Sequence, residues 1–283
     1  MSLSDLIKMN HRQGETPSIL PIIERHFIQS SAFNREKWEE KGQRFHPSKL
    51  SYWGACARSY ALFMLRDELK IEFEPPTPHK TSLLRIFEMG HSIHSMYQDK
   101  ILPKTGSLYG KWVRGEDVIE GFYPGEGWSY QEVRVWWPRY RLSGYIDGIV
   151  LISGKWYVLE IKSCNDNSFR YLKNVLKEPR SYHKTQSQLY VFAEKKLDRE
   201  IDLQGSIVLY INKDSGEELD FYVPRDKESI EGILNDIDQA IEAVENKIVP
   251  NRVSDCKTYR SKRAKDCFAC GACFSREDWN ELV

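Results

Sequence analysis

Apolar residues recur with helical spacing in several stretches of the chain. In residues 227–247 they fall on one stripe of an expected amphipathic helix, which we interpret as ordinary core packing. The members of that stripe are Ile230, Ile233, Leu234, Ile237, Ile241 and Val244. Residues 46–70, 81–101 and 183–197 show a similar pattern, and Ser48 is the expected N-cap of the first of these helices.

Between the helical stretches the pattern changes to one typical of strands. Residues 105–163 are rich in glycine, tryptophan and tyrosine and predict strands and hairpins. A further strand is expected at 205–212, with its hairpin partner at 218–224. Helices on either side of such strands indicate an α/β fold with a mixed central β-sheet flanked by helices.

We expect three segments along the chain. Residues 1–80 form a helical N-terminal part that includes Cys56, and residues 81–250 form the core. Residues 251–283 form a cysteine-rich, metal-binding C-terminal segment that packs on the N-terminal part.

Composition sets the bounds of this picture. The chain has 283 residues, of which 41% are hydrophobic and 12% aromatic, so it can form a packed core. Its 41 basic residues balance 41 acidic ones, so a surface for nucleic acid must be local. No run approaches the roughly 20 apolar residues that span a bilayer, and the polar start "MSLSDLIKMNHRQGE" is unlike a secretory signal. We therefore expect a cytoplasmic protein without a membrane partner.

The stretch "YIDGIVLISGKWYVLEIKSC", residues 145–164, carries acids inside two apolar runs. A turn at Ser153-Gly154 places Asp147 directly opposite Glu160, with Cβ atoms about 4.5–5.5 Å apart. Two such carboxylates repel unless one is protonated or a cation such as Mg²⁺ lies between them. Lys162 shares the face of Glu160. The alternative is a buried salt bridge between Lys162 and one of the acids.

With their neighbours, these motifs resemble a known family. "GYIDG" and "VLEIKS" are similar to the Asp and Glu-x-Lys core of PD-(D/E)xK nucleases, which implies a restriction-endonuclease-like core. "GHSIH", ending at His94, resembles the GxxxH helix of the RecB-like exonuclease branch, including its CRISPR-associated and phage members. "QSQLY", residues 186–190, resembles the QxxxY helix of that branch, and both motifs have i, i+4 spacing.

The resemblance implies roles for individual residues. It implies that Mg²⁺ or Mn²⁺ is bound by His94, Asp147, Glu160 and the backbone carbonyl of Ile161. Lys162 positions the attacking water and stabilises charge in the transition state, and Gln186 and Tyr190 orient the nucleic acid or Lys162. The residues themselves leave an alternative to each of two roles. His94 could instead be a core histidine with satisfied hydrogen bonds, and Tyr190 could instead be a packing residue.

The cysteines suggest a second metal centre. In a reducing compartment six cysteines indicate thiols or metal ligands rather than disulfides. The resemblance implies a [4Fe-4S] cluster held by Cys56, Cys267, Cys270 and Cys273, and the helical context expected for Cys56 favours it. Replacing Cys56 by Cys256 gives four local thiolates suited to a structural Zn²⁺, and this alternative stays open.

A basic stretch lies between two of the candidate ligand cysteines. We expect it to contact phosphates, although a solvated run of charges is the alternative. Its members are Lys257, Arg260, Lys262, Arg263 and Lys265. "RVWWPRYR", residues 134–141, is either a base-stacking surface or a strand with its tryptophans in the core.

These features predict a function and an alternative to it. The first is a divalent-metal-dependent deoxyribonuclease, an exonuclease on single-stranded or frayed DNA ends in recombination, repair or phage replication. It would act in the cytoplasm, or in the host cytoplasm if phage-encoded, and no helicase or recombination partner can be named. The alternative is a non-cleaving nucleic-acid-binding or assembly protein, against which the joint presence of Asp147, Glu160 and Lys162 argues.

Overall fold

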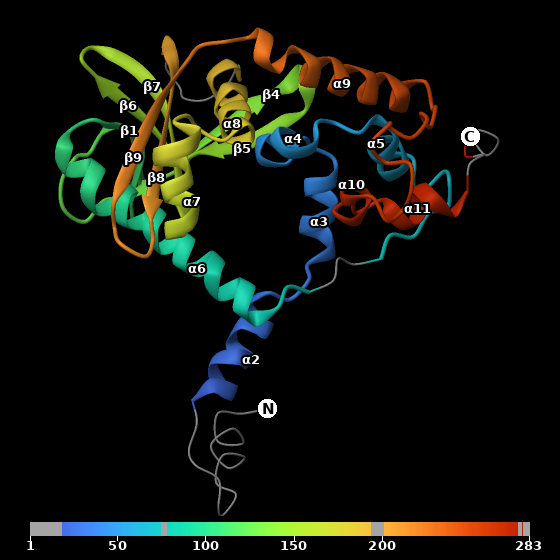
Figure 1. The fold of residues 1–283 in the computed structure, drawn as a ribbon, viewed down its shortest axis with the longest axis horizontal. Helices are drawn as coiled ribbons and strands as arrows, with labels where there is room; N and C mark the ends of the chain where they lie inside the picture. The colour runs from blue at the N-terminus through green and yellow to red at the C-terminus, as the bar shows by residue number, and fades with distance from the viewer. Residues whose placement is uncertain (1–18, 75–77, 194–200, 277–278, 280–283) are drawn as a thin grey trace, which may run out of the picture.

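The computed structural model describes residues 19–74, 78–193, 201–276 and 279. A seven-stranded sheet lies at its centre in the order β2-β1-β6-β7-β8-β9, with β3 also paired to β1, and β4 and β5 form a separate two-stranded sheet (Figure 1). The strands are β1 Leu108–Arg114, β2 Asp117–Phe122, β3 Ser129–Gln131, β4 Val133–Trp137, β5 Leu142–Ile146, β6 Gly148–Ile152, β7 Lys155–Cys164, β8 Leu203–Asn212 and β9 Glu218–Pro224. Only the β7–β8 pair is parallel among the described pairs, so the sheet is mixed and mostly antiparallel.

Helices cover both faces of this sheet. The helices of the described residues, not all of which contact the sheet, are α2 Leu20–Ser30, α3 Arg35–Gly42, α4 Pro47–Trp53, α5 Ala57–Met64, α6 Thr81–Ser95, α7 Asp166–Tyr171, α8 Ser181–Phe192, α9 Glu228–Glu245, α10 Lys262–Lys265 and α11 Cys270–Ser275. π-helical turns follow α6 at Met96–Ile101 and α7 at Leu172–Leu176. The expected mixed sheet flanked by helices, with a cysteine-rich C-terminal part, is confirmed.

Strand β7 has a different helix on each face. Val158 packs in one cluster with Leu189 of α8, whereas Ile161 packs in another with Tyr97. Because side chains alternate along a strand, Glu160 and Lys162 lie on the face of Val158, toward α8. The sequence of β7 thus places Glu160 and Lys162 on one face and Ile161, which lies between them, on the other.

The C-terminal helices lie beside the N-terminal ones. Figure 1 shows α10 and α11 next to α3 and α5, on the far side of α4 from the sheet. Phe63 of α5 is fully buried in a cluster with Ala269 and Cys273. This contact joins the segments expected for residues 1–80 and 251–283, whose boundaries stay a prediction.

The helix expected over 46–70 is divided in two. The first part, α4, begins at Pro47, whose fixed φ suits the first turn, and its N-cap is His46 rather than Ser48. The C-cap of α4 is Gly54, which has a φ of +66° that favours glycine. Cys56 is therefore the N-cap residue of α5 and lies between two helices, not within one.

The remaining expected helices and strands are largely confirmed. The helix expected over 183–197 begins at Ser181, and its expected end falls outside the described residues. In "RVWWPRYR", Trp137 is buried in the core, as the core alternative predicts, whereas Trp136 is half-buried and lies under the guanidinium of Arg44. Within the described ranges, no helix is both long and apolar enough to cross a membrane.

Candidate active site

The hairpin of β6 and β7 follows the register expected from the sequence. Ile149 pairs with Val158 and Gly148 with Leu159 across a turn at Ser153-Gly154. The ladder ends at that last pair, so Asp147 precedes β6 and is not a cross-strand partner of Glu160. Instead, Asp147 Oδ2 accepts a 2.6 Å hydrogen bond from the backbone N–H of Ile161. Asp147, just before β6, is thus fixed to β7, the strand that carries Glu160.

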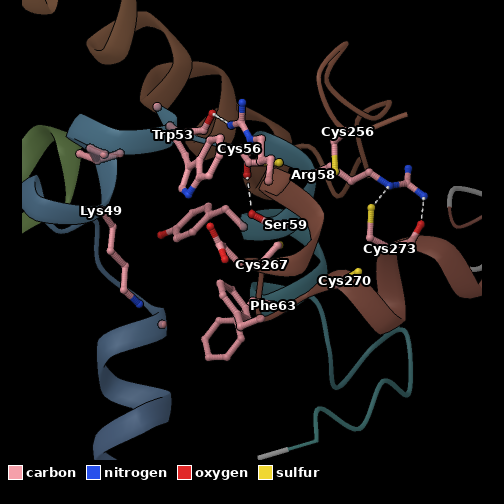
Figure 2. Close-up of a pocket in the computed structure, with 18 of the residues that line it drawn as sticks. Lys49, Trp53, Cys56, Arg58, Ser59, Phe63, Cys256, Cys267, Cys270 and Cys273 are labelled. Carbon is pink, nitrogen blue, oxygen red and sulfur yellow. Dashed lines mark hydrogen bonds between the residues drawn. The ribbon is translucent and has the colours of Figure 1, made fainter. Parts of the chain in front are cut away.

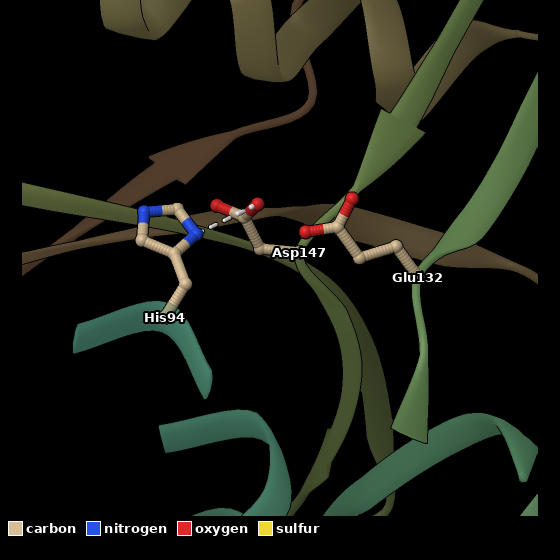
Figure 3. Close-up of side chains that lie close together, drawn as sticks. All are labelled: His94, Glu132 and Asp147. Carbon is tan, nitrogen blue, oxygen red and sulfur yellow. Dashed lines mark ion pairs between the residues drawn. The ribbon is translucent and has the colours of Figure 1, made fainter. Parts of the chain in front are cut away.

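Asp147 converges with two further candidate ligands. His94 Nδ1 lies 3.3 Å from Asp147 Oδ1, and ligand atoms of His94, Asp147 and Glu132 all lie within 4.8 Å of one another (Figure 3). Figure 3 shows the three side chains pointing to a common point from α6 and from two separate strand segments. An imidazole and two carboxylates at this spacing fit a divalent cation.

Glu132 was not identified from the sequence. It lies between β3 and β4, and its only signal was an acid at the start of an alternating run. Gln98, in the π-helical turn after α6, was also missed. Its Nε2 donates to the Asp147 backbone carbonyl at 2.8 Å and to Glu132 Oε1 at 3.3 Å. Gln98 therefore joins the two carboxylate-bearing segments.

The electrostatics of this group reflect its negative charge. Burial opposes protonation of His94, but the hydrogen bond and charge of Asp147 outweigh it, so the pKa of His94 is raised. Burial raises the pKa of Glu132, and the charge of Asp147 adds to this effect. The two carboxylates thus gain from a positive charge placed between them, whether it is a proton on His94 or a bound cation that takes the place of that proton.

Glu160 and Lys162 form an ion pair that leaves one oxygen over. Lys162 Nζ lies 2.5 Å from Glu160 Oε1, as the salt-bridge alternative predicts. Glu160 is only 1% exposed, and its buried Oε2 has no hydrogen-bond partner among the described residues. Burial, then the charge of Asp147, raises the pKa of Glu160 to about 7, against the lowering effect of Lys162.

Gln186 and Tyr190 are brought together on α8. Both are buried, and Gln186 Nε2 donates to the Tyr190 hydroxyl at 3.3 Å. Burial raises the pKa of Tyr190, and the charge of Glu160 adds to this effect. The ring also packs against Gly144, where an added Cβ would lie 3.0 Å from it. Tyr190 is therefore a core residue whose hydroxyl accepts from Gln186.

A second site lies where the region around α4 and α5 meets the C-terminal segment. Five of the six cysteines line one cavity of about 520 Å³, shown in Figure 2. They are Cys56, Cys256, Cys267, Cys270 and Cys273. The buried Arg58 donates to Cys273 Sγ at 3.3 Å and to its backbone carbonyl at 3.3 Å. The cavity therefore has four thiols from the C-terminal segment, and one from the N-terminal part.

Burial favours the neutral form of three of these thiols, those of Cys256, Cys267 and Cys270. Burial raises the pKa of Cys267 to about 12, and the neighbouring Cys56 and Cys273 raise it further. Burial also raises the pKa of Cys256 and of Cys270. A bound cation would release these protons.

The basic stretch differs from residue to residue. Arg263 donates to both oxygens of Asp255 at 3.1 Å and to the carbonyl of Ala55 at 3.1 Å, so it holds the segment together. Lys262 instead lies exposed on α10, over the rings of Tyr52 and Trp53. The three other members, Lys257, Arg260 and Lys265, are exposed.

Comparison with known proteins gives weak likenesses only. No family model matches the chain, and no curated protein matches it. Among solved structures, it resembles the crystal structure of SSO0001 with 16% identity over 92% of this chain and 97% of that one, at a TM-score of 0.40. It also resembles an alkaline exonuclease, LHK-Exo from Laribacter hongkongensis, with 12% identity over 75% of this chain and 93% of the other, at a TM-score of 0.43. Identities and TM-scores this low do not identify a family.

Proposed function

We propose that this protein is a divalent-metal-dependent deoxyribonuclease of the RecB-like branch of PD-(D/E)xK nucleases. It would act as an exonuclease on single-stranded or frayed DNA ends in recombination, repair or phage replication. The observation that carries this proposal is the buried Oε2 of Glu160, which has no hydrogen-bond partner among the described residues. Glu160 is not part of the converging group of His94, Glu132 and Asp147, but Asp147 is bonded to the N–H of the next residue, Ile161. A buried carboxylate oxygen without a partner is costly, and a cation removes that cost.

The donor set fits Mg²⁺ or Mn²⁺. We propose His94, Asp147, Glu160 and the Ile161 carbonyl as ligands, and we add Glu132 from its position in the group. Oxygen donors with one imidazole suit these ions better than they suit softer metals. The bound ion would supply Lewis-acid stabilisation and a water of lowered pKa.

The protein's own residues would then position the reactants. The ammonium of Lys162, fixed by Glu160 Oε1, would orient the attacking water and stabilise negative charge on the phosphate. Gln186 and Tyr190, buried on α8, would orient Lys162 or the nucleic-acid backbone, and Gln98 would keep the two carboxylate segments in place.

The cysteine centre is proposed as a [4Fe-4S] cluster held by Cys56, Cys267, Cys270 and Cys273. The cavity that brings Cys56 of the N-terminal part beside the three cysteines of the C-terminal segment supports this set. Cys256 lines the same cavity, so a structural Zn²⁺ held with Cys256 in place of Cys56 is the alternative.

The decisive experiment is incubation with end-labelled single- and double-stranded DNA in Mg²⁺, Mn²⁺ or EDTA. We expect cleavage from free single-stranded ends with either metal and none in EDTA. Asp147→Asn and Glu160→Gln should each abolish cleavage while they leave DNA binding largely intact. Equal cleavage in EDTA, or an undiminished variant, would contradict the proposal. DNA binding with no cleavage under any condition would favour the non-cleaving alternative.

A further inference from the structure

Three segments far apart in the sequence bring exposed aromatic and basic side chains together near the active site. The rings of Tyr52 in α4 and Tyr182 in α8 are 4.6 Å apart, tilted by 47°. The ammonium of Lys262 in α10 lies 5.8 Å from the Tyr52 ring centroid and 5.5 Å from that of Trp53. We call these four residues the aromatic platform.

Solvent exposure separates the platform from core packing. Tyr52 is 50% exposed. By contrast, two core tyrosines on neighbouring helices, Tyr60 of α5 and Tyr190 of α8, are each 4% exposed. Tyr182 and Trp53 are partly exposed and Lys262 is exposed. The Tyr52 ring therefore presents much of its surface to solvent, with a cation beside it.

The platform is continuous with the proposed cleavage site. Tyr182 lies one helical turn before Gln186 and two before Tyr190, so the three share a face of α8. Its neighbour His183 contacts the hydroxyl of Tyr210 at 2.7 Å, and Tyr210 is the strand partner of Lys162. On the other side, Tyr52, Trp53 and the cysteines line one cavity.

We propose that the aromatic platform binds single-stranded DNA, with an unpaired base stacked on Tyr52 and Tyr182 and a neighbouring phosphate contacted by Lys262. Aromatic faces accept any base, and a lysine beside them meets the backbone, which is the chemistry of a single-strand binding surface. A base in a duplex has both faces covered by its neighbours and cannot stack there. The inference rests on the proposed function, because that function supplies the cleavage site beside which the platform lies. If the platform binds as proposed, the strand that reaches this site is single-stranded.

Binding can be measured without cleavage. Wild type, Tyr52→Ala, Tyr52→Leu and Tyr222→Ala are titrated in EDTA with a single-stranded oligonucleotide that carries the fluorescent base 2-aminopurine. Tyr222 is the matched control, because it is 57% exposed and also contacts a tyrosine, but on β9. Both Tyr52 variants should weaken binding by about 5- to 150-fold, which corresponds to the roughly 1–3 kcal/mol that stacking of one base contributes. Tyr222→Ala should bind as wild type does.

An abasic series identifies stacking as the cause. In wild type, removing the base at one position should weaken binding, and in Tyr52→Ala the same removal should have no further effect. Lys262→Gln should lower the slope of log affinity against log salt by about 0.7, the value for one phosphate contact of a single strand. Thermal melting of each variant checks that it is folded.

The outcomes overturn or support the platform independently of cleavage. If Tyr52→Leu binds as wild type does, the ring is not stacked on a base and the proposal fails. The proposal would also fail if Tyr52→Ala and Tyr222→Ala lost the same amount of single-strand affinity. It would fail as well if Tyr52→Ala lost as much affinity for blunt duplex as for single-stranded DNA. Selective loss of single-strand binding in a protein that never cleaves DNA would support the platform and reject the proposed function. Cleavage that Tyr52→Ala leaves unchanged at every substrate concentration would reject the platform alone.

Discussion

Glu160 holds Lys162 with one oxygen, at 2.5 Å, and leaves its other oxygen buried without a partner among the described residues. The two alternatives that the sequence left open, a salt bridge and a metal ligand, are therefore compatible in one residue. One oxygen fixes the ammonium, and the second is free for a cation. The Glu160 carboxylate can thus hold Lys162, which would act on the attacking water, and a metal ion, which would bind that water.

Glu160→Gln should leave the metal-free protein at least as stable as wild type at neutral pH and above. Burial and the charge of Asp147 raise the pKa of Glu160 to about 7 against the opposing effect of Lys162, so the ionised carboxylate has a cost that the neutral amide does not have. Chemical denaturation of wild type, the single variant and the double variant Glu160→Gln/Lys162→Met measures the difference. Marked destabilisation of the single variant would mean that the ion pair with Lys162 outweighs burial and the repulsion from Asp147.

Glu132→Gln should weaken Mn²⁺ binding and cleavage by about 10- to 100-fold, as loss of a metal-site partner usually does. The reason is its position within 4.8 Å of the ligand atoms of His94 and Asp147. Isothermal titration with Mn²⁺ measures the affinity, and Glu126→Gln, an exposed acid of the loop before β3, is the matched control. Identical titrations for the two variants would exclude Glu132 from the site.

Lys162→Ala should lower turnover by roughly 10²- to 10³-fold without preventing Mn²⁺ binding, because an ammonium stabilises charge and is not a ligand. Lys162→Arg should rescue poorly, since a planar guanidinium keeps its proton and has a different shape. Single-turnover cleavage together with metal titration separates the two effects. A loss of metal affinity equal to that of Glu160→Gln would assign Lys162 a different role.

Protein purified without oxygen should be brown and contain roughly four irons per chain. Cys56→Ser should bleach it, and Cys164→Ser, a cysteine outside the cavity, should not. Metal analysis and visible absorption give the result. A colourless protein that loses zinc on Cys256→Ser, with little effect of Cys56→Ser, would establish the zinc alternative. In either case metal loss should weaken stability and substrate retention before it ends cleavage.

His183 should make the metal-free fold sensitive to acid. Burial, with Lys162 and Arg180 nearby, lowers the pKa of His183 to about 3, below the value of about 6.5 in an unfolded chain. The unfolded state then binds more protons between these values, so stability is fully present above pH 6.5 and is lost as pH falls toward 3. His183→Asn, which keeps a polar group near Tyr210, should remove this part of the pH dependence in denaturation curves. If the difference in the free energy of unfolding between variant and wild type did not change from pH 6.5 toward 3, the lowered pKa of His183 would be contradicted.

The sequence was most informative where motif spacing and backbone geometry coincide. The turn at Ser153-Gly154 determined the register of β6 and β7, because antiparallel partners lie at equal distances from it. It could not place the Asp147 side chain, which leaves the ladder to accept from Ile161, since that depends on how β5 enters β6. The positions of His94, Gln186 and Tyr190 agree with the expected arrangement, but their roles stay predictions.

Other parts of the site depend on tertiary contacts that leave no local pattern. Glu132 and Gln98 meet Asp147 only because β3 and the π-helical turn lie side by side, as the bond from the Tyr130 N–H to Asp99 also shows. The break at Gly54 was missed because apolar spacing continues across it, and positive φ is a property of the folded chain. The segment boundaries at 80 and 250 stay predictions.

The contact between α5 and the C-terminal segment also sets an order of events during synthesis. Arg58 bonds to Cys273, 215 residues later, and Phe63 packs in one cluster with Ala269 and Cys273 of that same segment. At about 5–20 residues per second, a ribosome would take roughly 10 to 45 s to make the intervening chain. During this interval α5 lacks its packing against α11, and until Cys256 is made the cavity lined by the cysteines has only its first thiol. The nascent protein could thus complete its hairpin and sheet before the cysteine centre can assemble, so that loading of this centre would mark the end of folding.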